Sequence, residues 1–389
     1  MNLERRTRLS QDSHTVVVKV GTRVLVDERG YLDPDRVAHL ADQLMTLRRQ
    51  RRVVLVSSGA VAAGMNTLGY KKRPADLAEL QAVAAVGQAK LIESYNHEFR
   101  RHRVAIDGAE VACHAAQVLL GADDFQNRVG YLNVRNTLLR LLDFPNVIPV
   151  INENDTVSVE ELQTTFGDND KLAALVTNML RAPLLIILST VDGLMDDRGQ
   201  VVPVVEQFDE RILGYVCDQK TGLSKGGMAS KLNNARLCTS SGETVIIANG
   251  RRPDVLTQIL AGEPLGTLFV PQSKSVSPRK RWIGAPATSR GKVLVNAGAC
   301  EAIRKAHGSL LAVGVVAVEG EFRKGDVVSL YLAGESGEIR GKEFARGLSN
   351  YSSDDLVRIQ GSQSQRIAEI LGHRPYEEVI HRDNMVLVE

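Results

Sequence analysis

The sequence of 389 residues has few cysteines, few aromatic side chains and no long apolar run. Its four cysteines are scattered and form no CxxC pair, so we expect neither a disulfide scaffold nor a zinc site, and the pattern fits a reducing cytoplasm. The longest apolar runs, such as Leu184–Leu188 and Leu310–Val313, fall far short of the roughly 18 residues that span a bilayer. No apolar stretch follows the charged N-terminus, so no signal peptide is expected. These absences predict a cytoplasmic globular protein without a membrane partner.

Two common phosphate-binding motifs are also missing. No two glycines are separated by a single residue, which excludes the GxGxxG motif of Rossmann domains and the glycine loop of protein kinases. The GxxxxGK[ST] pattern of P-loop proteins is absent as well. A phosphate-binding site in this chain must therefore be built differently.

Charge is balanced overall but unevenly placed. The net charge is +2, yet residues 271–291 carry five basic and no acidic side chains, and residues 292–389 sum to −2. A basic segment between two near-neutral parts is a weak signal for nucleic acid. A solvated connector is the simpler interpretation.

Aliphatic strands alternate with helical patterns from residue 15 to about 270. One helix is predicted after Asp33 and Pro34, since apolar residues follow at spacings of three and four. The strands are apolar along their whole length, which indicates a mostly parallel sheet covered on both faces. They are Thr15–Val20, Val53–Val56, Val147–Ile151, Leu184–Leu188 and Thr244–Ala248.

The pattern changes after a segment that holds three prolines and the only tryptophan. Short strands are predicted at 291–298, 310–318 and 326–332, with one helix near 299–306. We therefore expect a catalytic domain at 14–270, a basic linker at 271–290 and a small, mostly β domain at 291–380.

Polar clusters follow the predicted strands, where ligands of parallel sheets bind. Two lysines, Lys19 and Lys231, accompany them, the second within the glycine-containing run 226–231 at the predicted start of a helix. Between them lie the carboxylate- and amide-rich clusters Asn152–Asp155 and Gly167–Asp170. Phosphoryl transfer needs positive charge, a metal and groups that align the acceptor, and these are suitable parts. The Gly167–Asp170 run also fits an ordinary helix cap with a turn.

With these motifs, the sequence resembles the glutamate 5-kinases, enzymes of the amino-acid-kinase fold with a C-terminal PUA domain. The resemblance runs from about residue 14 to the C-terminus. It rests on 17–22, 56–64, 131–133, 150–155, 167–170, 226–228 and 381–385. It implies an α/β three-layer fold with a mostly parallel central sheet, plus a small, mostly β PUA domain.

The resemblance also implies a reaction. The γ-phosphate of MgATP would move to the γ-carboxylate of L-glutamate, giving L-glutamyl 5-phosphate, in the first step of proline biosynthesis. The acceptor is already ionised at neutral pH, so no general base is required. ATP phosphates and water would hold most of the Mg²⁺ coordination sphere, so no protein ligand is named. A homo-oligomer (dimer or tetramer), proline as feedback inhibitor and hand-over of the acyl phosphate to glutamyl-phosphate reductase are further expectations.

The resemblance also implies functional residues, at the positions where this sequence matches the family's motifs. Lys19, Lys231 and Asp170 are expected to be catalytic, and Ser58, Asp155, Asn169 and Asn152 to bind substrate. Simpler structural interpretations are that Ser58 caps a helix, that Lys19 is a strand-end lysine and that Asn152 is a turn residue. For Asp168 we prefer the role of N-cap for a helix over 171–180.

The expected ATP-binding residues are Lys19, Ser189, Thr190, Lys225, Gly226, Gly227, Met228, Ala229, Ser230 and Lys231. The family usually has Thr-Asp where this chain has Ser189-Thr190, and a small hydroxyl residue where it has Lys225. The stretch between Asp155 and Gly167 is slightly longer than in the family, which makes proline sensitivity an open question.

Two other functions remain open at this point. The same fold could use another acceptor, such as N-acetylglutamate or carbamate, although Asp155 favours a free α-ammonium group. Alternatively, the PUA domain could make the chain an RNA-binding regulator. The net charge of −2 on residues 292–389 argues against this, because it offers little counterion release on binding RNA. In addition, no aromatic stacking series is recognisable among Phe322, Tyr331, Phe344 and Tyr351.

Overall fold

The computed structural model describes residues 2–126, 128–156, 169–217, 227–272, 278–284, 287–334, 337–372 and 376–388. The chain divides into two compact units. The first comprises Met1–Asp124 and Val129–Ser275, and the second comprises Phe125–Arg128 and Val276–Glu389. The second unit therefore includes a four-residue segment from the N-terminal half of the chain.

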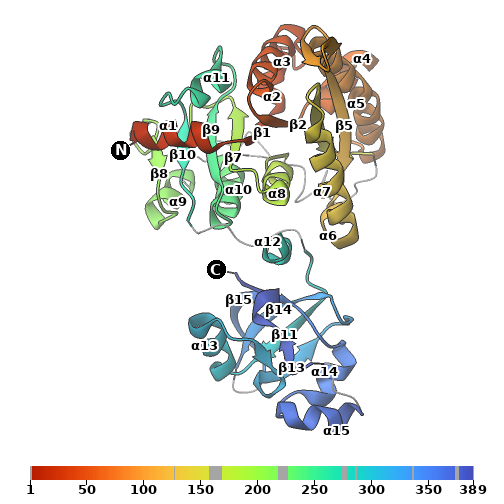
Figure 1. Cartoon of the computed structure of the whole chain (residues 1–389), viewed down its shortest axis with the longest axis vertical. Helices are drawn as coiled ribbons and strands as arrows, with labels where there is room; N and C mark the ends of the chain where they lie inside the picture. Colours follow the sequence, from red (N-terminus) through yellow and green to blue (C-terminus); the bar gives the residue numbers. More distant parts are fainter. Residues whose placement is uncertain are drawn as a thin grey trace. The chain divides into compact units, whose positions relative to one another are not determined.

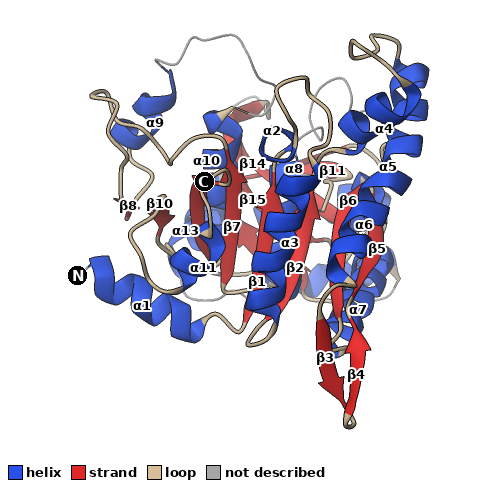
Figure 2. Ribbon diagram, turned by 90° about the horizontal axis from the view of Figure 1, so that it is seen from above, coloured by secondary structure: helices blue, strands red, loops and turns tan. Residues whose placement is uncertain are grey.

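An eight-stranded sheet forms the centre of the first unit (Figure 2). Its order is β5 (His114–Leu120), β6 (Val147–Glu153), β2 (Arg52–Ser57), β1 (Thr15–Val20), β7 (Leu184–Ser189), β9 (Thr244–Asn249), β10 (Thr267–Phe269) and β8 (Val204–Val205). The six strands from β5 to β9 are parallel, and β10 pairs antiparallel with β9. All six residues of β1 are buried, as expected of a central strand with both faces covered. The predicted mostly parallel α/β sheet is confirmed.

Helices cover both faces of this sheet (Figure 1). Alternate residues of β1 share one core cluster with α3 (Pro34–Arg48), α5 (Leu77–Phe99) and α11 (Val255–Leu260). On the other face, α8 (Asn169–Leu180) contacts β1, β7 and α10 (Met228–Ser240). The remaining elements up to residue 217 are α1 (Asn2–Asp12), α2 (Thr22–Leu25), α4 (Ala60–Leu68), the hairpin β3 (Arg103–Ile106)–β4 (Ala109–Ala112), α6 (Ala122–Gln126), α7 (Arg128–Asp143) and α9 (Glu210–Cys217). No described helix is both long and apolar enough to cross a membrane.

The predicted helix after Asp33 is α3. The Asp33 side chain accepts hydrogen bonds from the backbone N–H groups of Asp35 and Arg36, and Pro34 occupies the first turn, where its missing N–H is not needed. The predicted start of this helix is confirmed, because local capping chemistry sets it.

Two glycines bring α4 and α5 into backbone contact. A Cβ at Gly64 would lie 1.9 Å from the carbonyl oxygen of Val83, and one at Gly87 would lie 1.8 Å from that of Ala60. Any larger residue would push the helices apart. This contact fixes α5 against the turn that precedes Ala60.

The N-terminal helix α1 is tied to the first unit by Arg6, which is 1% exposed. Its guanidinium donates hydrogen bonds to the carbonyl oxygens of Pro203, Glu263, Leu265 and Gly266. Arg6 therefore joins the loop before β8 to the loop before β10.

A five-stranded sheet forms the core of the second unit. Its order is β13 (Val315–Glu319), β11 (Gly291–Val295), β14 (Val327–Ala333), β15 (Ile339–Leu348) and β17 (Met385–Leu387). The other elements are α12 (Pro278–Gly284), α13 (Ala297–Ala306), β12 (Leu310–Leu311), α14 (Ser353–Ile359), α15 (Ile367–Leu371), β16 (Glu378–Ile380) and three short 3₁₀ turns. The presence of a separate, mostly β C-terminal domain is confirmed.

Two details of the second unit differ from the sequence-based expectations. The predicted strand at 310–318 is interrupted by a 3₁₀ turn, Ala312–Gly314, where a Cβ at Gly314 would lie 2.6 Å from that of Ala299. The basic linker contains helix α12, in which Trp282 is buried and donates a hydrogen bond to the Phe125 carbonyl. Phe322, Phe344 and Tyr351 belong to the core cluster, so they offer no exposed stacking surface.

Candidate active site

The structure gathers side chains from four distant segments at the carboxyl edge of the large sheet. Lys19, Ser58 and Asn152 come from β1, β2 and β6 or directly follow them, and these strands are neighbours in the order β6-β2-β1. Parallel neighbours end at the same edge, and α8 begins there with Asn169 and Asp170.

Asp170 lies between two lysines at this edge. Its Oδ1 is 2.6 Å from Nζ of Lys19, and its Oδ2 is 2.9 Å from Nζ of Lys231. Asp170 is fully buried, and the lysine side chains are 6% and 10% exposed. Burial alone would raise the pKa of Asp170, but the two ammonium groups outweigh this effect and hold the pKa below its usual value. The cluster therefore keeps one positive charge in excess. Lys19 does lie near the end of β1, but its ammonium group pairs with Asp170 instead of reaching out to solvent.

A chain of amide hydrogen bonds lies beside this cluster. The Asn169 amide nitrogen donates to Ser58 Oγ at 2.8 Å and to Asn152 Oδ1 at 3.0 Å. The Asn152 amide nitrogen donates in turn to Gln88 Oε1 at 2.7 Å. Because Asn169 and Asp170 are consecutive, the first turn of α8 links the amide chain to the lysines.

Two of the simpler interpretations do not describe this arrangement. The residue at the N-cap of α4 is Gly59, with φ of 115° and no side-chain capping bond, so Ser58 does not cap the helix. Asn152 is 2% exposed within β6 and is not a turn residue.

A pocket of about 240 Å³ opens next to the amide chain. Asp155, Glu153, Gln88 and Gln117 line it, together with small residues of α5. Burial raises the pKa of Asp155 to about 6, and the positive charge of Arg73 only partly opposes this. Among the described residues, the positive charge near Asp155 does not outweigh the effect of burial.

Sequence reasoning assigned no role to Gln88 or Glu153. Glu153 lies inside the Asn152–Asp155 cluster, so its position between predicted site residues could have indicated that it belongs to the site. Gln88 lies within a 23-residue helix, and its contact with Asn152 spans 64 residues of sequence, so no local motif indicates it.

The expected nucleotide-binding residues are only partly described. Ser189 ends β7, its carbonyl accepts a hydrogen bond from Gly250 N–H at 2.8 Å, and both Ser189 and Thr190 are half-buried. Gly227 precedes α10, whose first turn contains Met228, Ala229, Ser230 and Lys231, so the predicted helix start is found at this place. Lys225 and Gly226, like Gly167 and Asp168, lie outside the described residues. A helix of this length favours an anion at its N-terminus.

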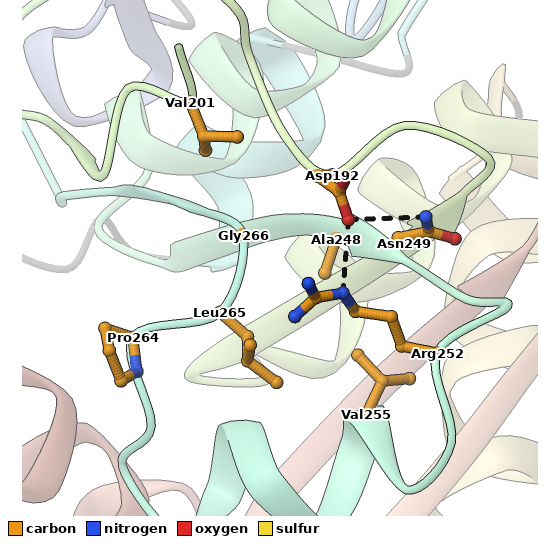
Figure 3. Close-up of a pocket in the computed structure, with 9 residues that line it drawn as sticks. All are labelled: Asp192, Val201, Ala248, Asn249, Arg252, Val255, Pro264, Leu265 and Gly266. Carbon is orange, nitrogen blue, oxygen red and sulfur yellow. Dashed lines mark hydrogen bonds and ion pairs between the residues drawn. The ribbon is translucent and has the colours of Figure 1, made fainter.

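A second pocket, of about 230 Å³, lies beside the ends of β7 and β9 (Figure 3). In it, Asp192 accepts a hydrogen bond from Asn249 at 3.3 Å and pairs with Arg252 at 3.2 Å. Leu265 and Gly266, whose carbonyls bind Arg6, form another part of its lining. None of those expected ATP-binding residues that the structure describes lines this pocket. It is therefore distinct from the lysine cluster.

Comparisons with known proteins agree with the division of the chain. Residues 14–249 match the model of the amino acid kinase family, and residues 291–371 match that of the PUA domain. The chain is 46% identical to the glutamate 5-kinase of Rhodopirellula baltica over 98% of this chain and 96% of that protein. It is 45% identical to the glutamate 5-kinase of Methylococcus capsulatus, over 96% and 97%. Among solved structures, carbamate kinase from Giardia lamblia bound to AMP-PNP is similar with a TM-score of 0.46 and 16% identity, over 67% of this chain and 99% of that one.

Proposed function

Because the chain belongs to the amino acid kinase family, as a glutamate 5-kinase with a PUA domain, we propose that the Lys19–Asp170–Lys231 cluster binds the phosphates of ATP and that the adjoining pocket binds L-glutamate. The family reaction is transfer of a phosphoryl group from ATP to the side-chain carboxyl group of glutamate, the first step of proline biosynthesis. One observation carries the assignment of the site: consecutive residues of α8, Asn169 and Asp170, join the amide chain to the two lysines.

The lysine cluster suits charge stabilisation during phosphoryl transfer. Lys19 would bridge the ATP phosphates, and Lys231 would neutralise the charge that develops on the leaving side. Asp170 holds both ammonium groups in fixed positions, so little reorganisation is needed when the transferring group becomes more negative.

Mg²⁺ fits this site as a companion of the nucleotide. Both Asp170 oxygens face lysines, and among the described residues no group of three or more histidines, cysteines or acids is arranged to hold a metal ion. The ion would arrive on the ATP phosphates and supply further positive charge there. The first turn of α10, with Gly227–Lys231, together with Ser189, Thr190, Lys225 and Gly226, would form the remaining nucleotide contacts.

The amide chain and the pocket suit a dicarboxylate amino acid. Ser58, Asn152 and Asn169 would place the carboxylates, and Asp155 would bind the α-ammonium group. The reacting carboxylate is ionised at neutral pH and needs no general base.

The domain limits 14–270, 271–290 and 291–380 remain our proposal, as do a homo-oligomer and inhibition by proline. Since the product is an acyl phosphate, which hydrolyses and cyclises, we also propose its hand-over to glutamyl-phosphate reductase. A coupled assay with that reductase, showing no rate advantage over free diffusion of the intermediate, would refute the hand-over.

The test is formation of hydroxamate by purified protein supplied with MgATP, L-glutamate and hydroxylamine, which traps an acyl phosphate. N-acetylglutamate serves as the competing acceptor and Lys231→Ala as the variant. We expect hydroxamate and ADP from L-glutamate alone, with loss of both in the variant. Turnover of N-acetylglutamate, or full activity in Lys231→Ala, would contradict the proposed site.

A further inference from the structure

Tyr95 carries a hydroxyl group into the core of the first unit. The residue lies on α5, is completely buried and stacks on Phe99, with the ring centroids 6.0 Å apart. Its hydroxyl oxygen is 2.9 Å from Oγ of Ser57, the last residue of β2, which is also completely buried. A buried hydroxyl group costs free energy unless it is hydrogen-bonded, and a phenylalanine would fill nearly the same volume without this cost. Packing alone therefore does not account for the hydroxyl of Tyr95.

The direction of this hydrogen bond follows from the number of protons that are present. Ser57 Oγ is also 2.9 Å from the carbonyl oxygen of Ser58, which can only accept. A serine hydroxyl has one proton, and Ser57 donates it to that carbonyl, so the proton between Tyr95 and Ser57 comes from Tyr95. Burial raises the pKa of Tyr95, so its hydroxyl keeps this proton at neutral pH. Tyr95 thus donates to Ser57, and Ser57 donates to Ser58, in an arrangement that we name the Tyr95 relay.

The Tyr95 relay ends on the peptide bond between Ser58 and Gly59. The described residues contain no cis peptide bond, and in a trans peptide the C=O and N–H groups point in opposite directions. The carbonyl of Ser58 is turned toward the buried hydroxyl of Ser57, so the N–H of Gly59 is turned away from it. This N–H has no hydrogen-bond acceptor among the described residues. It is therefore left for a ligand that binds at the end of β2.

Gly59 makes the orientation of this peptide easy to lose. Its φ is 115°, and a glycine adopts negative φ values as readily as positive ones. A rotation of the Ser58–Gly59 peptide by about 180° would exchange the places of its carbonyl and its N–H. Asn169 donates to Ser58 Oγ and to the Ser57 carbonyl, but among the described residues only Ser57 Oγ donates to the Ser58 carbonyl. The orientation of the peptide thus depends on the relay.

We propose that Tyr95 is a positioning residue for the amino-acid side of the site, which acts through Ser57 and keeps the Gly59 N–H turned toward the substrate. This inference rests on the proposed function, in which Ser58 helps to place a carboxylate of L-glutamate. A rotated peptide would present a carbonyl oxygen to that carboxylate, and two negative groups repel each other. Tyr95 is fully buried and does not touch the substrate itself.

The experiment compares Tyr95→Phe, Ser57→Ala and the double substitution in the hydroxamate assay. Tyr95→Phe removes one neutral hydrogen bond at the start of the relay, so the KM for L-glutamate should rise about five- to tenfold. Ser57→Ala removes the donor to the Ser58 carbonyl and should raise this KM by about 10- to 30-fold. If Tyr95 acts through Ser57, the double substitution should match Ser57→Ala within about twofold instead of giving the product of the two effects. The KM for ATP should stay within about twofold in all three variants, because Asp170 holds the lysines independently.

Tyr70→Phe is the matched control. The hydroxyl of Tyr70 also donates to a side chain of α5, Glu79 Oε1 at 2.7 Å, but this bond is exposed. Its loss should leave the KM values for L-glutamate and ATP unchanged.

Three results would overturn the inference. They are an unchanged KM for L-glutamate in Tyr95→Phe, a KM for ATP that rises as much as that for L-glutamate, and a double substitution whose effect equals the product of the single ones. If Ser57→Ala does not fold, the comparison of Tyr95→Phe with Tyr70→Phe decides by the first two. Wild-type protein that forms no hydroxamate from L-glutamate would refute the proposed function and the inference with it, whereas an active wild type with an unaffected Tyr95→Phe would refute the inference alone.

Discussion

The lysine cluster and the amino-acid pocket treat buried charge in opposite ways. Asp170 lies between two ammonium groups and has a lowered pKa, whereas among the described residues Arg73 only partly offsets the burial of Asp155, whose pKa is raised to about 6. Glu153, in the same pocket, has an oxygen without a donor among the described residues. On the phosphate side, the carboxylate is therefore already paired before substrate arrives and one positive charge is left for an anion, whereas the carboxylate Asp155 on the amino-acid side favours a cation.

This difference indicates how each half of the site affects the stability of the folded protein. A preorganised cluster stabilises developing charge without rearrangement, and removal of one buried partner from it destabilises the fold. An uncompensated carboxylate lowers the stability of the free protein but makes binding of an ammonium group more favourable. Substitutions in the two halves should thus change stability in opposite directions.

The largest effect is expected for Asp170→Asn. Two buried lysines would lose their shared counter-charge, which costs about 3–5 kcal/mol when a buried pair is broken. The kcat should fall by about 100-fold or more, because the lysines no longer keep their positions. Urea denaturation and the hydroxamate assay measure the two effects.

Asp143→Asn is the control for that substitution. Asp143 also pairs with two basic residues, Arg52 and Arg140, but its side chain is 43% exposed. Exposed pairs contribute at most about 1 kcal/mol, so this variant should remain close to wild type. Equal destabilisation by both substitutions would show that burial does not make the ion pairs of Asp170 more important for stability than exposed ones.

Asp155→Asn should raise stability while it weakens substrate binding. The raised pKa means that the charged form is disfavoured in the folded protein, so the neutral amide should stabilise it by about 1–3 kcal/mol at pH 7.5. The KM for L-glutamate should rise about tenfold or more, with little change in the KM for ATP. A loss of stability in this variant would show that Asp155 is already compensated in the free protein.

The pH dependence follows from the same group. Below pH 6, Asp155 takes up a proton and no longer attracts the ammonium group, so kcat/KM for glutamate should fall about tenfold per pH unit. The folded protein binds this proton more tightly than the unfolded chain, so stability from this group decreases as pH rises from about 4 to 6. Both trends should disappear in Asp155→Asn, and a wild-type profile that stays flat to pH 5 would contradict them.

The smallest effect is expected for Gln88→Leu. This change removes one neutral hydrogen bond to Asn152, worth about 1 kcal/mol, so the KM for glutamate should rise roughly fivefold. Gln50→Leu, at an exposed position in the turn after α3, provides the control. If Gln88→Leu alters the KM for ATP as much as that for glutamate, the amide chain belongs to both halves of the site.

The fold and the convergence of the polar clusters could be predicted from the sequence, because each depends on local patterns. Aliphatic runs such as that at 184–188 become buried strands, and parallel strands bring Ser58 and Asn152 to one edge. The position of Lys19 next to Asp170 was implied only by the family resemblance, since nothing local links residues 151 positions apart.

Other features could not be read from the sequence because they arise from packing. The contact of Gly87 with Ala60 sets where α5 crosses α4, and this crossing brings Gln88 to Asn152. The reversal of β10 depends on a three-residue strand that is too short to give a periodic signal. The turn at Ala312–Gly314 depends on the close approach of Ala299.

The Arg6 contacts have a practical consequence for anyone who expresses this protein. The match to the amino acid kinase family begins at residue 14, which makes that position an inviting place to start a shortened recombinant gene. Such a product would lack α1, and the four carbonyl oxygens that Arg6 satisfies would be left to water next to the core. The useful boundary for cloning lies before this helix, and an affinity tag is better placed upstream of an intact α1 than in its stead.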